Sequence, residues 1–372
     1  MNKTIETNKV TATRFIEAFN TDDWDTVREV VASNYVFHHP DSGTVQAGPE
    51  GMVAAWSAFK NALPDSWHPI PVMIAEGDYV AVLFPTYGHF TGESYHGIKP
   101  TSNWLEYGMV NIVRFEDGKI MEAWFGMDPL VEKQQMGVAP SLPFRQLNAT
   151  ENANIELFQQ TINTAGLEYD NLTAFGNVVA ALGPPQSVKD AFKRKVEIYH
   201  VVNGTLELGY NHEFITNPPY AGDPSADTEL SRAVIKRFFK GVLIGHDLNT
   251  GAKIASPNIL IHSTAMPCEA SHYGINGMSD WLNKQWLTFP DLTIVNSFTV
   301  AHGDIVAVSW TARGTSHGTF LTLPQTGKTV EYTGVSMYRV EDGKIAEIWE
   351  TRNTLGIMRQ LNPDIGGSHH SR

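Results

Sequence analysis

Glu350 is the residue whose position first points to chemistry. It ends a strand-like segment in which alternation places Ala346, Ile348 and Glu350 on one face, so the carboxyl extends an apolar row. Loss of hydration at such a place disfavours the charged form and raises the carboxyl pKa towards the range of a general acid or base. The alternative is an ordinary ion pair with Arg352 or Arg359.

A second candidate is His262, which ends the strand-like run Asn-Ile-Leu-Ile-His at residues 258–262. A neutral imidazole there could orient a substrate carbonyl or relay a proton to it. It could equally be a hydrogen-bonded histidine at a strand end, and the sequence leaves both open.

Further residues are candidates for a substrate pocket beside Glu350. The following four lie on the predicted strands of the same region: Trp310, Tyr332, Ser336 and Trp349. Aromatic residues on strands also serve as ordinary core. His317, between two glycines, is expected at an exposed hairpin tip, and the single cysteine, Cys268, is interpreted as a small apolar residue rather than a nucleophile.

Several histidines and an acid near the beginning of the chain raise the question of a metal site. They are His38, His39, His89, His96 and Glu106. No His-x-His or His-x-x-x-His spacing occurs among them, so we expect no metal site and no cofactor.

These residues belong to a chain that repeats itself. The Gly-x-x-Gly-Met at residues 48–52 recurs 226 positions later, as do Pro64-Asp65 and the segment from Ala75 to Val82. The phrase Glu-Asp-Gly-Lys-Ile recurs 225 positions after its first occurrence. The repeat predicts two copies of one fold, at residues 8–148 and 228–363. The acid of the second copy, Glu350, has Phe125 as its counterpart in the first.

Within each copy the apolar period changes from that of helices to that of strands. Residues 14–19 and 24–31 have helical spacing, with Asp22 and Asp23 suited to an N-cap. In the second copy, residues 306, 308, 310 and 312 alternate with 305, 307, 309 and 311, as on the two faces of a strand. Glu-Asp-Gly at 341–343 is typical of a hairpin turn. Each copy is therefore predicted to be an α+β domain with helices on one concave sheet face.

The region between the copies, residues 149–227, matches neither. Residues 154–162, 172–182 and 188–202 have apolar spacing that we interpret as helical, with a break at Gly183-Pro184-Pro185 and a loop from Phe214 to Asp227. We therefore expect a helical connector. Asp128, which precedes Pro129 in the first copy, is expected to cap a helix.

Composition limits the possible partners. The chain has 372 residues, 42% of them hydrophobic, and a formal net charge of −13. Nucleic acid and anionic membrane surfaces are therefore disfavoured. The polar N-terminal segment and the lack of a long apolar run favour a cytoplasmic protein.

The order of these motifs resembles the SnoaL-like polyketide cyclase family of the NTF2-like superfamily. The resemblance runs through the second copy, from Arg232 to Pro363, and more weakly through the first. It implies two cone-shaped α+β barrels, each a curved antiparallel sheet around helices, and intramolecular aldol condensation without metal or organic cofactor. Family cyclases place an acid near the end of a late strand, which corresponds here to Glu350. Their Gln and His on the preceding strand correspond to Gly334 and Ser336, so the aldol reaction itself does not follow.

The functional expectation is a cofactor-independent acid/base enzyme acting on a small apolar oxygenated molecule. The first copy, which has Phe125 in place of the acid, is expected to be non-catalytic. The alternative is a non-catalytic protein that binds a hydrophobic ligand or acts as a scaffold. Because NTF2-like domains commonly pair through their sheets, we also expect an internal pseudo-dimer and consider a homodimer possible.

Overall fold

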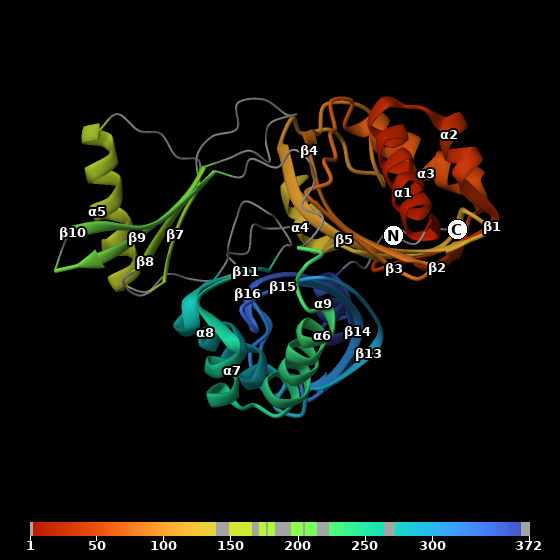
Figure 1. Ribbon diagram of the computed structural model, residues 1–372. Coiled ribbons are helices and arrows are strands. Elements are labelled where there is room, and N and C mark those ends of the chain that lie inside the picture. The colour runs from red at the N-terminus through yellow and green to blue at the C-terminus, as the bar shows by residue number, and fades with distance from the viewer. Residues whose placement is uncertain are drawn as a thin grey trace.

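The computed structural model describes residues 3–138, 149–165, 171–175, 178–182, 195–203, 205–213, 223–263 and 272–365. Two domains of the same architecture and a smaller middle segment make up this part of the chain (Figure 1). We call the elements from α1 to α4 domain one and those from α6 to α9 domain two.

Domain one places helices against a six-stranded sheet in the order β2-β1-β6-β5-β4-β3. Its elements are α1 (Lys3–Thr21), α2 (Trp24–Val30), β1 (Val31–His39), β2 (Gly43–Gln46), α3 (Gly48–Ala62), β3 (Val72–Glu76), β4 (Tyr79–His89), β5 (Trp104–Glu116), β6 (Lys119–Gly126) and α4 (Pro129–Gln135).

Domain two repeats this order as β12-β11-β16-β15-β14-β13. Its elements are α6 (Thr228–Arg237), the π-helical turn η2 (Phe238–Ile244), α7 (Leu248–Ile254), β11 (Ala255–His262), β12 (His272–Tyr273), α8 (Gly274–Thr288), β13 (Thr293–His302), β14 (Ile305–Thr315), β15 (Thr329–Glu341), β16 (Lys344–Arg352) and α9 (Thr354–Leu361).

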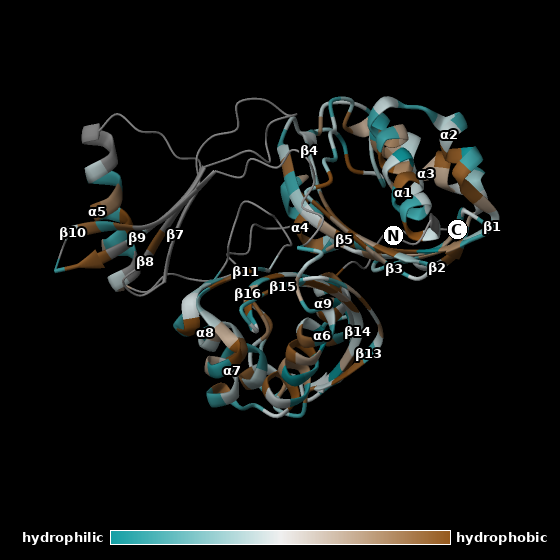
Figure 2. Cartoon of the chain, viewed as in Figure 1, coloured by the Kyte–Doolittle hydropathy of each residue, from teal (hydrophilic) through white to brown (hydrophobic). Residues whose placement is uncertain are grey.

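Local sequence explains much of this architecture. Asp23 caps α2 by accepting a hydrogen bond from the Thr26 amide, and Asp128 caps α4 by accepting one from the Leu130 amide, both as predicted. The two Asp-Gly pairs at 117–118 and 342–343 have positive φ angles at both residues, which is the backbone of the tight hairpin turn expected there. In Figure 2, helices α1, α2 and α7 carry both apolar and hydrophilic residues, as amphipathic helices that cover a sheet do.

Both sheets are antiparallel except for one pair of strands each. β1 runs parallel to β6, and β11 runs parallel to β16, so the sheets are mixed rather than purely antiparallel. A helix and four strands separate β1 from β6 along the chain, and the same holds for β11 and β16, so no tight hairpin joins these partners and they can pair in parallel.

The middle segment corrects one prediction. Helix α5 (Ala149–Ala165) lies where a helix was expected, but residues 172–175, 178–182 and 195–202, also expected to be helical, are strands. The segment packs α5 on a four-stranded antiparallel sheet of β7 (Asn171–Phe175), β8 (Val178–Leu182), β9 (Lys195–Val202) and β10 (Thr205–Glu213). Val, Ile and Tyr are frequent in these runs, and such residues favour strands over helices. The predicted break at 183–185 and most of the predicted loop, residues 214–222, lie outside the described residues.

The convex faces of the two large sheets pack against each other. A buried apolar cluster joins Val72, Ile74, Ala81, Leu83, Val110 and Ile112 of domain one to Val300, Ile305, Ala307, Val335, Met337 and Trp349 of domain two. The second face of β14, predicted from alternation, is therefore buried against the other domain. We call this interface between the two sheets the seam. Gly126 lies in the seam, where an added Cβ would overlap Val110 and would lie 2.5 Å from the Thr351 hydroxyl.

Polar contacts continue the seam at its edges. Arg232 of domain two forms an ion pair of 2.6 Å with Glu76, whose other carboxylate oxygen accepts the Ala301 amide at 2.9 Å. At the other edge, Asp41 binds both Lys133 and Arg359, so a carboxylate of domain one contacts domain two.

Candidate functional site

Strand pairing places Glu350 in the concave interior of domain two. Glu350 lies directly opposite Ser336 of β15, and the neighbouring pair on the same face is Ile348 and Tyr338. Ile348 and Tyr338 belong to the interior core of the domain. The Glu350 residue is only 6% exposed. The predicted inward direction of its apolar row thus agrees with the structure, although a register shift moves Ala346 out of the row and Ile345 into the core.

Aromatic and hydroxyl groups surround this carboxyl. Trp310 Nε1 donates a hydrogen bond of 2.9 Å to the Ser336 hydroxyl, and the Tyr338 side chain is also hydrogen-bonded to Ser336. Trp310 meets Tyr332 edge to face, with ring centroids 5.9 Å apart. The strands thus bring together Trp310, Tyr332 and Ser336, which are three of the four predicted pocket residues. Tyr338, which was not predicted, lies beside them.

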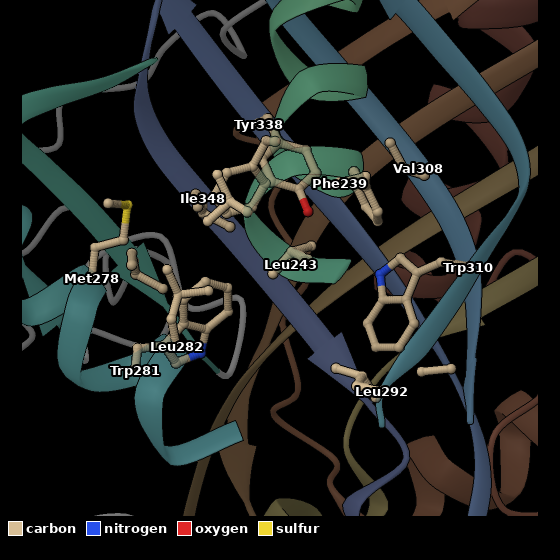
Figure 3. Packing of buried hydrophobic residues seen from close by; sticks show 14 of the residues in the cluster. Phe239, Leu243, Met278, Trp281, Leu282, Leu292, Val308, Trp310, Tyr338 and Ile348 are labelled. Atoms are coloured by element: carbon tan, nitrogen blue, oxygen red, sulfur yellow. The ribbon is translucent and has the colours of Figure 1, made fainter. Parts of the chain in front are cut away.

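The rest of the interior is apolar. Figure 3 shows side chains from η2, α8 and the sheet turned towards a common core, with Trp310 and Tyr338 among them. The labelled residues from the helical elements are Phe239, Leu243, Met278, Trp281 and Leu282. A carboxyl in these surroundings is poorly solvated, and its electrostatic interactions are strengthened accordingly.

The electrostatics follow from this burial. Burial raises the pKa of Glu350, and the positive charge of Arg352 opposes the shift only in part, since Nη1 lies 4.0 Å from Oε1. The other proposed partner, Arg359, binds Asp41 of domain one instead. Burial also raises the pKa of Tyr338, and it raises that of Tyr332 to about 12. Both phenols therefore remain protonated donors at neutral pH.

His262 and Trp349 lie on the opposite face of the sheet from Glu350. His262 is the strand partner of Trp349, and the two rings stack with centroids 5.6 Å apart. His262 Nε2 is 2.9 Å from Glu347 Oε1, and Arg339 Nε is 3.2 Å from the other oxygen of the same carboxylate. The expectation that His262 borders the pocket of Glu350 is therefore wrong, because successive strand residues point to opposite faces.

Domain one repeats this convex-face arrangement. His38 contacts Glu122 at 2.8 Å and stacks on Trp124, and Arg114 binds the same carboxylate. The repetition of a His–Glu–Arg group beside a tryptophan indicates a shared structural element of the two sheets. In the second copy, burial alone would raise the pKa of Glu347, but the hydrogen bond from His262 and the charge of Arg339 outweigh it and lower the pKa.

The interior of domain one also contains a buried carboxyl, which the sequence analysis missed. Glu132 of α4 accepts a hydrogen bond of 2.8 Å from the Tyr107 hydroxyl. Burial raises the pKa of Glu132. Tyr107 is the counterpart of Tyr332, while the counterpart of Glu132 in domain two is Ile357, a core residue.

Each of these two interiors therefore contains the shared tyrosine and an acid. The acid lies on a helix in domain one and on a strand in domain two. Domain one has Phe125 on its strand and Glu132 on its helix, whereas domain two has Glu350 on its strand and Ile357 on its helix. A comparison of the aligned copies at position 132 could have revealed this exchange.

The polar chain of domain one extends further. Tyr107 is also hydrogen-bonded to Thr86, whose hydroxyl lies 3.2 Å from His68 Nδ1. Burial lowers the pKa of His68 to about 3, so its ring is neutral. The ring packs against Phe19, with centroids 4.6 Å apart, and its Nε2 is buried without a hydrogen-bond partner.

The remaining candidates of the sequence analysis are dispersed. His89 pairs with Asp65 at 2.7 Å, and His317 is exposed. Glu106 accepts a hydrogen bond from Trp104 Nε1, and Cys268 lies outside the described residues. Within the described ranges no group of three His, Cys, Asp or Glu side chains is arranged to hold a metal ion. No helix in those same ranges is long and apolar enough to cross a membrane.

The fold of each domain is that of an NTF2-like α+β domain, which the chain contains twice. The model of the SnoaL-like polyketide cyclase family matches residues 9–136 and again 233–361. The chain belongs to this family, and it contains two tandem copies of the family's domain.

Two solved structures are similar to part of this chain. IdmH from Streptomyces antibioticus is 28% identical, with 35% of this chain and 99% of IdmH covered and a TM-score of 0.32. TsrD from Streptomyces laurentii is 23% identical, with 37% and 98% covered and a TM-score of 0.34. No curated protein matches the sequence.

Proposed function

We propose that domain two is a cofactor-independent acid/base enzyme of the cyclase, isomerase, dehydratase or hydrolase type. The substrate would be a small apolar molecule with a carbonyl or related oxygen. One observation carries the proposal: the Glu350 carboxyl is buried in an apolar interior, where burial raises its pKa. A buried acid of raised pKa is the usual property of a general acid or base that works near neutral pH.

In this mechanism Glu350 is the catalytic residue. The carboxylic acid donates its proton to the substrate oxygen, and the resulting carboxylate accepts a proton from the neighbouring carbon. Tyr332 and Tyr338 stay protonated and donate hydrogen bonds to the oxygen on which negative charge develops. Trp310 supplies an apolar wall, and Ser336 holds its indole in place through the bond to Nε1.

The alternative is that the interior binds a ligand without chemistry. The hydrogen bond between Trp310 and Ser336 favours it, because the hydroxyl at the position of a family histidine is engaged in a structural contact. The packing of the two sheets supports a related proposal, that the chain acts as its own pseudo-dimer.

Deuterium exchange at the α-carbon of 2-tetralone in D2O, followed by NMR, would test the enzyme proposal with a simple carbonyl probe. The protein should accelerate exchange over buffer, and Glu350→Gln should reduce the acceleration by about 10² to 10⁴ while the fold is kept. The matched control is Glu341→Gln, at an exposed position on the neighbouring strand β15.

Affinity for the same probe separates the two functions. If the protein only binds ligands, both variants should bind 2-tetralone with equal affinity, and deuterium exchange should be no faster than in buffer. Acceleration that is unchanged in a folded Glu350→Gln protein would refute the role of this residue.

A further inference from the structure

A cleft lies between the two domains, along the facing sides of their sheets. It has a volume of about 300 Å³ and is lined by residues of β1, β2 and β6 from domain one and of β13 to β16 from domain two. This volume is at the lower end of the range for small-molecule sites and corresponds to about ten water molecules. Since both domains line it, it exists only because the two copies pack together.

The floor of the cleft is a group of hydroxyls on the convex face of domain two. Thr311 and Thr333 are direct partners on β14 and β15, and Ser309 lies two residues from Thr311 on the same face. Ser297 of β13 adds a fourth hydroxyl beside them. Within the described part of the chain these four hydroxyls form no hydrogen bond, so their donors and acceptors are available to a ligand or to water.

The counterparts of these residues in domain one carry no hydroxyl. Ser309 corresponds to Leu83, Thr311 to Pro85 and Thr333 to Gly108. Leu83 belongs to the apolar cluster between the sheets. The hydroxyl floor is therefore a property of domain two alone and is not inherited from the shared fold.

The facing wall from domain one is aromatic. Trp124 and Phe125 line it together with His39. The Trp124 ring is held by stacking on His38 and by an edge contact with Phe298, whose centroid lies 4.5 Å away. A fixed indole beside a flat sheet face suits a planar aromatic ring.

The ionisable side chains among the described residues that line the cleft are His38, which contacts Glu122 at 2.8 Å, and His39. None of its described lining residues is Asp, Glu, Lys or Arg. Burial lowers the pKa of His39 to about 4, so its imidazole is uncharged at neutral pH. Its Nδ1 accepts the amides of Asp41 and Ser42, which places the ring hydrogen on Nε2 as a further donor. A charged ligand would lose hydration here without gaining an opposite charge.

We propose that this cleft binds a neutral, planar aromatic molecule of one or two rings that carries a hydroxyl or carbonyl oxygen. The ring lies against Trp124, and the oxygen exchanges hydrogen bonds with Ser309, Thr311 and Thr333. Glu350 does not line the cleft, and the proposal does not depend on the acid/base function.

Calorimetric titration with 2-naphthol at pH 7.5 tests this binding. The informative variant is Ser309→Ala/Thr311→Val/Thr333→Val, which removes three hydroxyls with little change of shape. Thr299→Val, on β13 and outside the lining, is the matched control. Circular dichroism and melting establish that each protein is folded, and the single change Thr333→Val at an exposed residue provides a milder second variant.

The wild type and the Thr299→Val control should bind 2-naphthol with equal affinity, and the triple variant should bind at least about 10-fold more weakly. Naphthalene should bind all proteins alike, and 2-naphthoate, which is anionic at this pH, should bind more weakly than 2-naphthol. Equal binding of 2-naphthol by the wild type and the folded triple variant would overturn the proposal, as would an absence of binding to the wild type.

Discussion

Replacement of Asp128 by asparagine should stabilise the protein above about pH 6. Asp128 is 5% exposed and caps α4 by accepting the Leu130 amide at 3.1 Å. It also forms a hydrogen bond with Thr354 of domain two, so it lies between the domains. The corresponding cap of α9 is Asn353, which shows that an amide can serve at this position.

The structure supplies the size of the effect. Burial, opposed in part by the hydrogen bonds from Thr354 and Leu130, raises the pKa of Asp128 from 3.8 to about 6. A shift of about two units corresponds to ~3 kcal/mol. Because the folded pKa is raised, the unfolded chain ionises first as the pH increases, and stability falls between about pH 4 and pH 6. Above pH 6 the folded protein bears the full free-energy cost of a buried, ionised Asp128 carboxylate, and Asp128→Asn removes this cost.

Urea unfolding at several pH values, followed by tryptophan fluorescence, measures this difference. The stability of Asp128→Asn relative to wild type should rise by up to ~3 kcal/mol from pH 4 to pH 6 and then stay level. The matched control is Asp23→Asn, at the exposed cap of α2. Its hydrogen bonds with Thr26 lower the pKa of Asp23, so wild-type stability is lost there as the pH falls below about 4. A difference for Asp128→Asn that does not change with pH would refute the reasoning.

Three other substitutions test the packing. Gly126→Ala should destabilise the protein by ~1–3 kcal/mol, because its Cβ would overlap Val110 in the seam, and an unchanged melting temperature would contradict this. Glu347→Ala should cost ~3 kcal/mol in urea unfolding, since it leaves the buried His262 without its carboxylate; a loss below ~1 kcal/mol would count against that pair. Phe125→Glu should cost ~2 kcal/mol without creating activity, and a variant as stable as wild type would disprove burial of the new carboxyl.

Local patterns determined much of what could be predicted. The internal repeat, the two Asp-Gly hairpins and the caps at Asp23 and Asp128 depend on a few neighbouring residues, and all are present in the structure. The inward direction of Glu350 also follows from alternation along one strand. The middle segment was predicted incorrectly because its short apolar runs fit both periods, and its β-branched residues decide for strands.

The tertiary structure alone decided the surroundings of each side chain. Alternation separates the two faces of β14, but only the packing of the second sheet buries Ile305 and Ala307. The position of the His262 side chain follows from strand register, because His262 pairs with Trp349, which lies on the face away from Glu350. Glu132 reaches Tyr107 because α4 packs against β5, a contact between residues 25 positions apart. Such contacts depend on where whole elements pack, and the local sequence of one strand or helix does not contain that information.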